Sequence, residues 1–462
     1  MARSAPAPTS PTSLPPTGPG HQDGRSGAAK VLALSTAGFT LMFAAWLMFG
    51  ILGKPISAEL GLSEVQLSWV IAAAVLNGSL WRLPAGMITD RIGGRKVMTF
   101  LLLASAIPAY LVSKADSYAT LVILAFFVGF AGNSFSSGIA WNSAWQGRSR
   151  QGFALGLFGA GNVGASVTKF VGPPLIAGTT VGATYMGIFP GGWRFVPVLY
   201  AVLLTLMAAA TWFLAPHEDR TPGAAQPLRT QLAPLRQIRV WRFSLYYVAF
   251  FGAYVALAAW LPTYYMDNFD VSLQSAAYLT ASYIFPASLL RPFGGWLSDR
   301  FGARRVMYWS LGTMAACTAL LMMPNGHLVI AHPDGSQSEH LAYSMGLLPF
   351  VLVVFLLGCS MGVGKAAVYK HIPEYFPDNV GAVGGLVGML GGLGGFFLPP
   401  LFAYTKVWSG FPSSTFFVLF VLTVFCAFWM HWTVIHMLHT QSPDLARHIE
   451  RPGSKAPEEA LA

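Results

Sequence analysis

The chain of 462 residues is long enough for about three soluble domains, but its composition excludes that organisation. Charged residues make up 10% of the chain, where about 25% is usual in soluble proteins, and hydrophobic residues make up 54%. A mean hydropathy of +0.54 and a net charge of +10 instead indicate a polytopic helical protein of the lipid bilayer with basic loops.

Apolar segments recur along the chain at the length of a membrane-spanning helix, about 20 residues. Residues 1–29 are rich in Pro, Ser and Gly and lack an apolar core, so they are predicted to be a disordered cytoplasmic tail. The polar linker 215–241 separates a six-helix half over 30–214 from a second over 242–440, and residues 441–462 form another polar cytoplasmic tail. The resulting all-α membrane protein has twelve predicted spans, at 31–52, 64–88, 97–113, 119–143, 152–176, 194–214, 243–265, 273–297, 304–323, 344–367, 380–404 and 414–437.

The basic residues are divided unequally between the two sides of the predicted bundle. Most of the 28 Lys and Arg residues lie in the tails and in loops on the same side, whereas the other side has Lys54, Lys114 and Lys406. The positive-inside rule therefore places both termini in the cytoplasm of a multi-pass protein of the inner membrane. The same rule explains the net positive charge, so no nucleic-acid partner is predicted.

Two segments of the chain repeat one another. Residues 82–96 read RLPAGMITDRIGGRK, and residues 291–305 read RPFGGWLSDRFGARR. Each copy lies at the junction between the second and third spans of its half, and duplicated halves with a site between them are a known transporter architecture. One constant offset pairs Arg82 with Arg291, Gly86 with Gly295, Asp90 with Asp299 and Arg91 with Arg300.

The G-x-x-x-D-R-x-G-x-R element of both segments resembles the loop motif of the major facilitator superfamily. This resemblance implies two pseudo-symmetric six-helix halves that enclose one central site. It also implies that a charge relay sets which side of the carrier is open, formed by Asp90, Arg91, Asp299 and Arg300.

Arg82 and Arg291 are predicted to lie deep in the membrane. Arg82 precedes Asp90 by eight residues, about 12 Å along a helix, and Arg291 precedes Asp299 by the same distance. An arginine at this depth is costly and indicates a functional site by default. Neither span has an acidic residue in its interior, so an anion between the two guanidinium groups is the natural counter-charge. Their planar donor forks suit a planar oxyanion.

Spans five and eleven are rich in glycine, which lets helices approach and slide closely. The segments GAGNVG at 159–164 and GMLGGLGGF at 388–396 resemble the two signature stretches of the nitrate/nitrite porter family. This resemblance implies nitrate, and also nitrite, as substrates, and Gly164 and Gly391 as positions where the helices must close. It implies anion contacts for Arg82, Arg291, Asn162, Tyr247, Phe49 and Phe135, although the two phenylalanines are equally typical of an ordinary core.

Two lysines lie inside predicted spans, Lys169 after the first signature and Lys365 in span ten. Desolvation favours the neutral form of a lysine, so either residue is a candidate for proton exchange. We expect Gly362 and Gly364 to leave room for water beside Lys365. The alternative for Lys365 is a side chain that extends to an aqueous cavity or a helix end. An intramembrane lysine and the stretch KHIPEYFP at 370–377 resemble the proton-coupled symport branch of the family.

The sequence therefore predicts a monomeric secondary transporter that carries nitrate with protons by alternating access. Nitrate/nitrite exchange and transport of another small anion are alternatives. A membrane anion sensor is a third, although the short polar tails offer no domain to relay a signal. No catalytic motif indicates an enzyme and no cofactor is predicted. No metal site is predicted either, because the cysteines lie singly and the histidines of the last span, His431, His436 and His439, approach a helix end.

Overall fold

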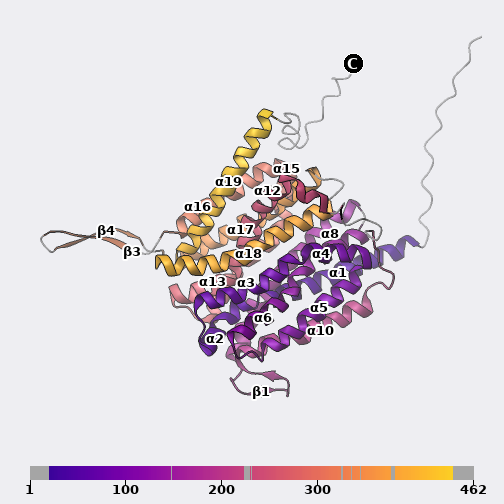
Figure 1. Ribbon diagram of the computed structural model, residues 1–462, viewed down its shortest axis with the longest axis horizontal. Coiled ribbons are helices and arrows are strands. Elements are labelled where there is room, and N and C mark those ends of the chain that lie inside the picture. Colours follow the sequence, from indigo (N-terminus) through magenta and orange to yellow (C-terminus); the bar gives the residue numbers. More distant parts are fainter. Residues whose placement is uncertain are drawn as a thin grey trace, which may run out of the picture.

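The computed structural model describes residues 20–146, 148–222, 229, 232–323, 326–333, 336–343, 345–375 and 380–440. Within these residues the chain is almost entirely helical (Figure 1). Nine helical stretches of the described residues are long and apolar enough to cross a membrane. Helices also occupy the other three predicted spans, at 152–176, 273–297 and 304–323. The predicted all-helical membrane fold is therefore confirmed.

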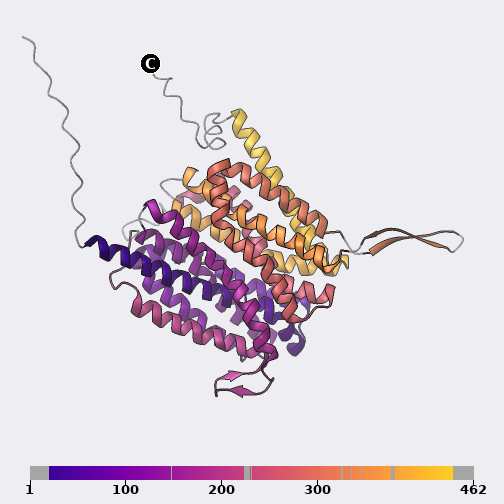
Figure 2. The ribbon, with the colours of Figure 1, turned by 180° about the vertical axis from the view of Figure 1, so that it is seen from behind.

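The chain forms two bundles that pack side by side, the first coloured indigo to magenta and the second pink to yellow (Figures 1 and 2). They meet where α18 packs along α3, α14 along α9, and α13 along α2. The first bundle consists of α1 (Gly20–Trp46), α2 (Phe49–Leu60), α3 (Glu64–Leu80), α4 (Arg82–Ile92), α5 (Gly94–Val112), α6 (Tyr118–Val128), η1 (Gly129–Asn133), α7 (Ser134–Trp145), α8 (Arg148–Ala160), η2 (Gly161–Val163), α9 (Gly164–Ala177), β1 (Thr184–Tyr185), β2 (Phe189–Pro190), η3 (Gly192–Arg194) and α10 (Phe195–Leu214). The second consists of η4 (Ala233–Arg236), α12 (Ile238–Tyr247), η5 (Val248–Gly252), α13 (Ala253–Phe269), α14 (Leu273–Leu289), α15 (Arg291–Phe301), α16 (Ala303–Leu321), β3 (Gly326–Ala331), β4 (Gln337–Tyr343), α17 (Leu347–Tyr375), α18 (Val380–Ser409) and α19 (Ser414–Thr440).

We call the end of the bundle where α1 begins and α19 ends the terminal face, and the other end the opposite face. Two antiparallel hairpins, β1–β2 and β3–β4, project at the opposite face (Figure 1). These strands are not predicted by the sequence. They lie in connections between spans, where the apolar periodicity that identifies spans carries no information about short strands.

The repeat in the sequence is also a repeat in the structure. In each half the second span breaks before the repeated arginine, at Trp81 and at Leu290, whose backbone dihedrals are nearly the same. An 11-residue helix follows each break, α4 in one half and α15 in the other. Each of these helices ends at a glycine with positive φ, +94° at Gly93 and +88° at Gly302, and a 19-residue helix follows. Only glycine adopts this conformation readily, which explains why the motif carries it at this position.

Several spans change their helical geometry part-way along their length. Short 3-10 segments interrupt span four at η1 and span five at η2, and the π-helical segment η5 interrupts span seven. Irregular backbone within a membrane is tolerated where protein buries it or where it lines a cavity, and π-helical turns are frequent at functional sites. Asn162 lies in η2 and Tyr247 ends α12 directly before η5, so two of the predicted anion contacts lie at these interruptions.

The first helix begins earlier than its apolar pattern predicts. Composition places residues 20–29 in a disordered tail, whereas α1 begins at Gly20. Packing explains the difference, because Gly27 lies against the ring of Trp145 and the Gln146 side chain donates a hydrogen bond to the Ala28 carbonyl. The predicted linker is likewise shorter, since α12 begins at Ile238. Residues 1–19 and 441–462 of the predicted tails lie outside the described residues.

Candidate anion-binding site

The two repeated arginines, one from each half, lie against the same aromatic ring. Arg82 begins α4 and Arg291 begins α15, one in each half. Their guanidinium carbons lie 5.5 and 5.8 Å from the ring centroid of Phe135 on α7, so the carbons are at most about 11 Å apart. The structure therefore brings together three residues that the sequence predicts for one site.

The guanidinium of Arg82 is fully buried and is held by carbonyl groups and rings. Its Nε donates to the Gly78 carbonyl at 2.8 Å, and its Nη1 donates to the Gly388 carbonyl of the other half at 3.1 Å. Nη2 of Arg82 and Nη1 of Arg291 are buried with no hydrogen-bond partner among the described residues. Neither arginine pairs with a carboxylate in this part of the chain. Two positive groups with unused donors thus lie at one place between the halves.

Two rings that the sequence does not identify complete the surroundings of Arg82. Trp46 lies 5.4 Å and Phe251 lies 5.0 Å from the guanidinium carbon. Phe49, which was predicted to contact the anion, is buried at the start of α2 and is not among the described rings over Arg82. Trp46 and Phe251 could not be singled out, because they resemble the many other aromatic residues of apolar spans.

Tyr247 lies in the same cluster, as predicted, with a neighbour that was not predicted. Its ring stacks on Phe251 at a centroid distance of 5.1 Å, and its buried hydroxyl has no partner among the described residues. Tyr369 of α17 packs edge-on against Tyr247 at 5.0 Å and donates a hydrogen bond to the Gly384 carbonyl. Tyr369 follows Lys365 by one helical turn, and this spacing is the only signal in the sequence that could have identified it.

Asn162 lies on the side of span five that faces the arginines. A Cβ atom on Gly159, one turn before Asn162, would lie 3.4 Å from Nη1 of Arg291. Asn162 itself is fully buried, and neither its amide oxygen nor its amide nitrogen has a partner among the described residues. A donor and an acceptor are therefore unused close to the arginine pair.

Lys365 of α17 is buried near Arg291. Its Nζ lies 3.5 Å from the ring centroid of Tyr254, and it forms no hydrogen bond in the described part of the chain. The expectation that Gly362 and Gly364 leave room for water is wrong. A Cβ on Gly362 would lie 2.8 Å from the Pro286 carbonyl, and one on Gly364 would lie 2.2 Å from the Phe250 ring. These glycines admit neighbouring protein atoms, not water.

The glycines named by the sequence pack within each half. A Cβ on Gly164 would lie 1.9 Å from the Thr40 carbonyl of α1, and one on Gly391 would lie 2.3 Å from Tyr247. The glycines of α18 that meet the other half are different residues. A Cβ on Gly392 would lie 2.7 Å from the Ser79 hydroxyl and 3.3 Å from Nη1 of Arg82. Glycine on α18 thus lets the two halves approach at the arginine site.

We expect Gly392→Ala to reduce anion transport about tenfold or more. The added methyl group must displace Ser79 and the Arg82 guanidinium, and overpacking of this kind costs about 1–3 kcal/mol. Gly156→Ala is the matched control, because a Cβ at Gly156 would meet nothing within 4 Å. Initial rates of labelled anion uptake into proteoliposomes measure the difference. Equal rates for the two variants would show that contact at Gly392 does not limit transport.

The residues of the predicted charge relay lie at the terminal face. Asp299 pairs with Lys370 of α17 at 2.6 Å, and both side chains are exposed. Asp90 is half-buried near the end of α4, whereas Arg91 and Arg300 are exposed. The structure thus gives Asp299 a partner within its own half that the sequence did not predict.

A second charged cluster at the terminal face was missed because its acidic member lies in the linker. Asp219 accepts hydrogen bonds from the backbone nitrogen of Arg95 and from the indoles of Trp141 and Trp145. It therefore ties the linker to the loop motif of the first half. No pattern in the sequence connects Asp219 with these distant residues.

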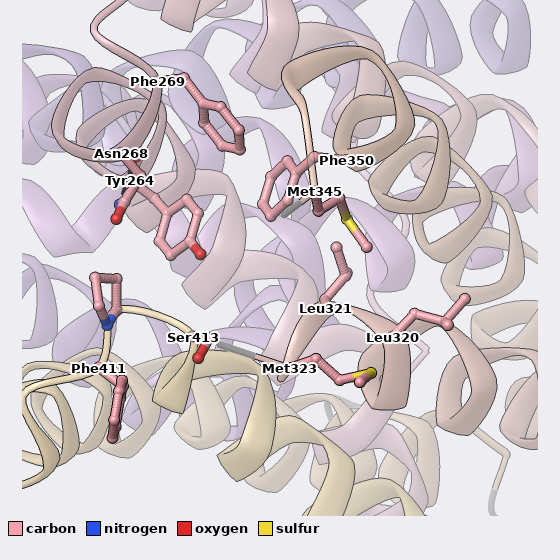
Figure 3. A pocket seen from close by; sticks show the side chains of 11 residues that line it. Tyr264, Asn268, Phe269, Leu320, Leu321, Met323, Met345, Phe350, Phe411 and Ser413 are labelled. Carbon is pink, nitrogen blue, oxygen red and sulfur yellow. Dashed lines mark hydrogen bonds between the residues drawn. The ribbon is translucent and has the colours of Figure 1, made fainter. Parts of the chain in front are cut away.

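The structure also has a cavity of about 250 Å³ where the ends of α13 and α16 meet the start of α17 and the residues before α19 (Figure 3). Tyr264, Phe350 and Phe411 are among its lining residues, and none of the lining residues is charged. Such a cavity offers an anion no counter-charge, so it is not the candidate site.

The described residues also contain no group of three or more His, Cys, Asp or Glu side chains that could hold a metal ion. His431 lies 3.0 Å from the Tyr308 hydroxyl, and the side chains of His436 and His439 lie outside the described part.

Comparison with known proteins places the chain in a family. It matches the family model of the Major Facilitator Superfamily over residues 34–325 and 264–459. It is 61% identical over 426 residues to the "Probable nitrate/nitrite antiporter NarK1" of Thermus thermophilus, with 92% of this chain and 96% of that protein covered. It is 32% identical over 384 residues to the "Probable nitrate/nitrite transporter NarK2" of Mycobacterium tuberculosis, with 81% and 88% covered. The crystal structure of a bacterial homolog of the lysosomal transporter Spinster, inward-facing and occupied, shares the fold with a TM-score of 0.63, at 16% identity and with 87% and 96% covered. The chain therefore belongs to the Major Facilitator Superfamily and, within it, to the nitrate/nitrite porter family.

Proposed function

We propose that this protein transports nitrate across the membrane by alternating access. The observation that carries the proposal is the pair of arginines that lie against Phe135 with unused donors and with no carboxylate partner among the described residues. A planar monovalent oxyanion supplies the missing charge and accepts paired hydrogen bonds from both guanidinium groups. The names of the relatives from Thermus thermophilus and Mycobacterium tuberculosis support nitrate as that anion, with nitrite as a second substrate.

Electrostatics explains why such a carrier reorients only when it is loaded. Without an anion, Arg82 and Arg291 repel one another in surroundings of low polarity. A bound anion neutralises part of this charge and draws α4 of one half toward α15 of the other. The rocking of two halves around one central site is the established way in which such duplicated folds work. One chain contains all of these residues, which supports a monomer as the working unit.

Ion pairs connect the two halves at the opposite face. Lys54 of α2 pairs with Asp267 of α13, and Lys406 of α18 pairs with Glu64 of α3 at 2.6 Å. Lys406 also lies 3.7 Å from Asp267, so the four residues form one network of alternating charge. We refer to these four residues as the four-charge network. It must open whenever the carrier exposes its site at the opposite face.

We expect Lys406→Gln to shift the carrier toward the state that is open at the opposite face. The change removes two ion pairs, each worth about 0.2–1 kcal/mol at partly exposed positions, so the population ratio should change about two- to thirtyfold. Double electron–electron resonance between spin labels at Leu62 and Gln274, which lie in different halves, measures the change in the distance between the halves. Lys114→Gln is the matched control, because Lys114 is exposed at the same face and outside the network. Identical distance distributions for the two variants would contradict a gating role for the network.

We further propose that nitrate enters together with a proton carried by Lys365. The positive charge of Arg291 repels a positive charge on Lys365 while the site is empty, and the negative charge of a bound nitrate attracts it. Binding linkage is reciprocal, so a proton on Lys365 strengthens nitrate binding by the same factor. The carrier therefore binds nitrate more tightly with the proton than without it, and one nitrate with one proton crosses without net charge.

Exchange of nitrate for nitrite is the second candidate for the coupling. The relative from Thermus thermophilus is named a probable nitrate/nitrite antiporter, which favours exchange. The arginine pair is compatible with exchange, because an anion would occupy the site in both directions of the cycle.

Flux of labelled nitrate into proteoliposomes tests these proposals together. Symport predicts accumulation driven by an inward proton gradient without internal nitrite, whereas exchange predicts uptake that needs internal nitrite and ignores the proton gradient. A sensor binds nitrate without accumulating label under either condition. Competition by unlabelled anions identifies a carrier of another small anion.

We also propose that both termini lie in the cytoplasm and the protein in the inner membrane, which the distribution of Lys and Arg supports.

A further inference from the structure

Span five carries a line of buried polar side chains that continues beyond the central site. Asn162, Ser166 and Lys169 are each at most 1% exposed. The amide of Asn162, the hydroxyl of Ser166 and the Nζ of Lys169 have no hydrogen-bond partner among the described residues. Residues spaced by three or four positions lie on one side of a helix, so these three side chains form a continuous polar column.

Neighbouring contacts establish which way the column faces. On one side of it, Gly164 and Thr168 contact α1, where Thr168 donates a hydrogen bond to the Ala44 carbonyl. On the other side, Phe170 packs against Tyr278 of α14 in the second half. The column lies between these two directions and therefore faces the interface between the halves.

The column begins at the arginine pair. Gly159, one turn before Asn162, lies against the Arg291 guanidinium. From Asn162 the column extends toward the opposite face, and Lys169 lies about 10 Å farther along the span. Lys169 is still eight residues, about 12 Å, from the end of α9 at Ala177.

Among the residues that the structure describes, none supplies a counter-charge for Lys169. On every described membrane helix, Asp and Glu lie within three residues of a helix end, so none is at the depth of Lys169. An ammonium group that is desolvated and unpaired is costly to bury. A small anion would supply a counter-charge to Lys169 and an acceptor for the Ser166 hydroxyl and the Asn162 amide.

We infer that Asn162, Ser166 and Lys169 form a second anion-binding site, displaced from the arginine pair toward the opposite face. Its ligand is a small monovalent oxyanion, the same class as the proposed substrate, so the inference rests on the proposed function. Asn162 belongs to both sites and passes the anion between the arginines and Lys169. The second site gives the anion a stepping position on the route to the opposite face.

Equilibrium dialysis of the purified full chain against labelled nitrate tests the second site. The unmodified protein is expected to bind two nitrate ions per chain, and Lys169→Gln one. Loss of a hydrogen bond to a charged group weakens the second site about ten- to a hundredfold, whereas the first site keeps its affinity. Lys169→Arg keeps the charge and should bind two. Thr168→Val is the matched control, since Thr168 is adjacent on the helix but faces α1, and this variant should also bind two.

Each contrary result identifies which idea fails. One nitrate per unmodified chain, or two in Lys169→Gln, overturns the second site and leaves the proposed function standing if flux persists. The absence of both nitrate binding and flux in the unmodified protein overturns the proposed function. Binding of one nitrate by Lys169→Arg as well as by Lys169→Gln would contradict a role for the charge. A protein in which Lys169 only exchanges a proton would bind one nitrate throughout.

Discussion

Replacing either Arg82 or Arg291 with lysine is expected to reduce nitrate transport by about ten- to a hundredfold or more. A lysine keeps the positive charge but replaces the planar fork with a single ammonium. Arg82 uses two donors on the Gly78 and Gly388 carbonyls and still has Nη2 available for the anion. The single nitrogen of a lysine cannot occupy the separate positions from which Nε, Nη1 and Nη2 of Arg82 reach the two carbonyls and the anion. Each hydrogen bond to a charged group that is lost costs about 1.5–3 kcal/mol, which gives the stated factor.

The comparison needs an arginine outside the site that undergoes the same change. Arg305 is suitable, because it is exposed at the start of α16 and belongs to the same repeated motif. Initial uptake rates and nitrate binding should be unchanged in Arg305→Lys and strongly reduced in the other two variants. Near-normal uptake by both Arg82→Lys and Arg291→Lys would refute the central site as described.

The arginine pair could be predicted from the sequence because two independent constraints act on it. A charge deep in an apolar span is costly, so it is informative even in a single sequence. The repeated motif then gives both arginines the same distance from a loop aspartate. The structure adds the reason for the common depth, since Trp81 and Leu290 break their spans in the same way directly before the arginines.

The rings around the pair could not be predicted in the same way. Trp46, Phe251 and Tyr369 lie in spans that contain many aromatic residues, and burying any of these rings is favourable. Apolar patterning reports that a side chain is buried but not which neighbour it meets. The choice between Phe49 and Trp46 depends on the turn between α1 and α2, which the apolar pattern does not indicate.

The glycines illustrate the same limit. Their abundance in spans five and eleven predicts close helix contacts, and such contacts are present at Gly164 and Gly391. The sequence gives no direction for these contacts, however. Gly164 meets α1 of its own half, whereas Gly392, one residue after Gly391, meets Ser79 and Arg82 of the other half. A shift of one position rotates a helical residue by about 100°, so the partner helix follows only from the packing.

The positions of the two lysines distinguish how they can contribute to transport. Lys365 lies against Tyr254, and Tyr369 one turn farther along α17 contacts Tyr247 of the arginine cluster. Lys169 lies on the column that leads away from this cluster toward the opposite face. A proton on Lys365 therefore affects anion binding at the central site directly. A charge on Lys169 instead affects the path of the anion between the central site and the opposite face. This separation is why the coupling proposal rests on Lys365 alone.

Lys365→Met is accordingly expected to abolish nitrate uptake driven by an inward proton gradient while nitrate binding persists. Nitrate is the anion of a strong acid and carries no proton itself at neutral pH. Inward movement of one negative charge against a negative-inside potential costs about 2.3 kcal/mol per 100 mV, and a proton carried with it cancels that cost. In the variant, nitrate would move without its proton, so a proton gradient could no longer drive accumulation. Lys96→Met, at an exposed position of α5, should behave as the unmodified protein does.

Measurement of both uptake and binding separates loss of coupling from loss of the site. Loss of binding together with uptake would show that Lys365 supports the anion site and does not carry the proton. Uptake by the unmodified protein that needs internal nitrite and ignores the proton gradient would instead establish exchange. In that case Lys365 would serve as a permanent positive charge beside Arg291, and Lys365→Met should weaken exchange in both directions equally. Proton-driven uptake that persists in Lys365→Met would assign the proton to another group.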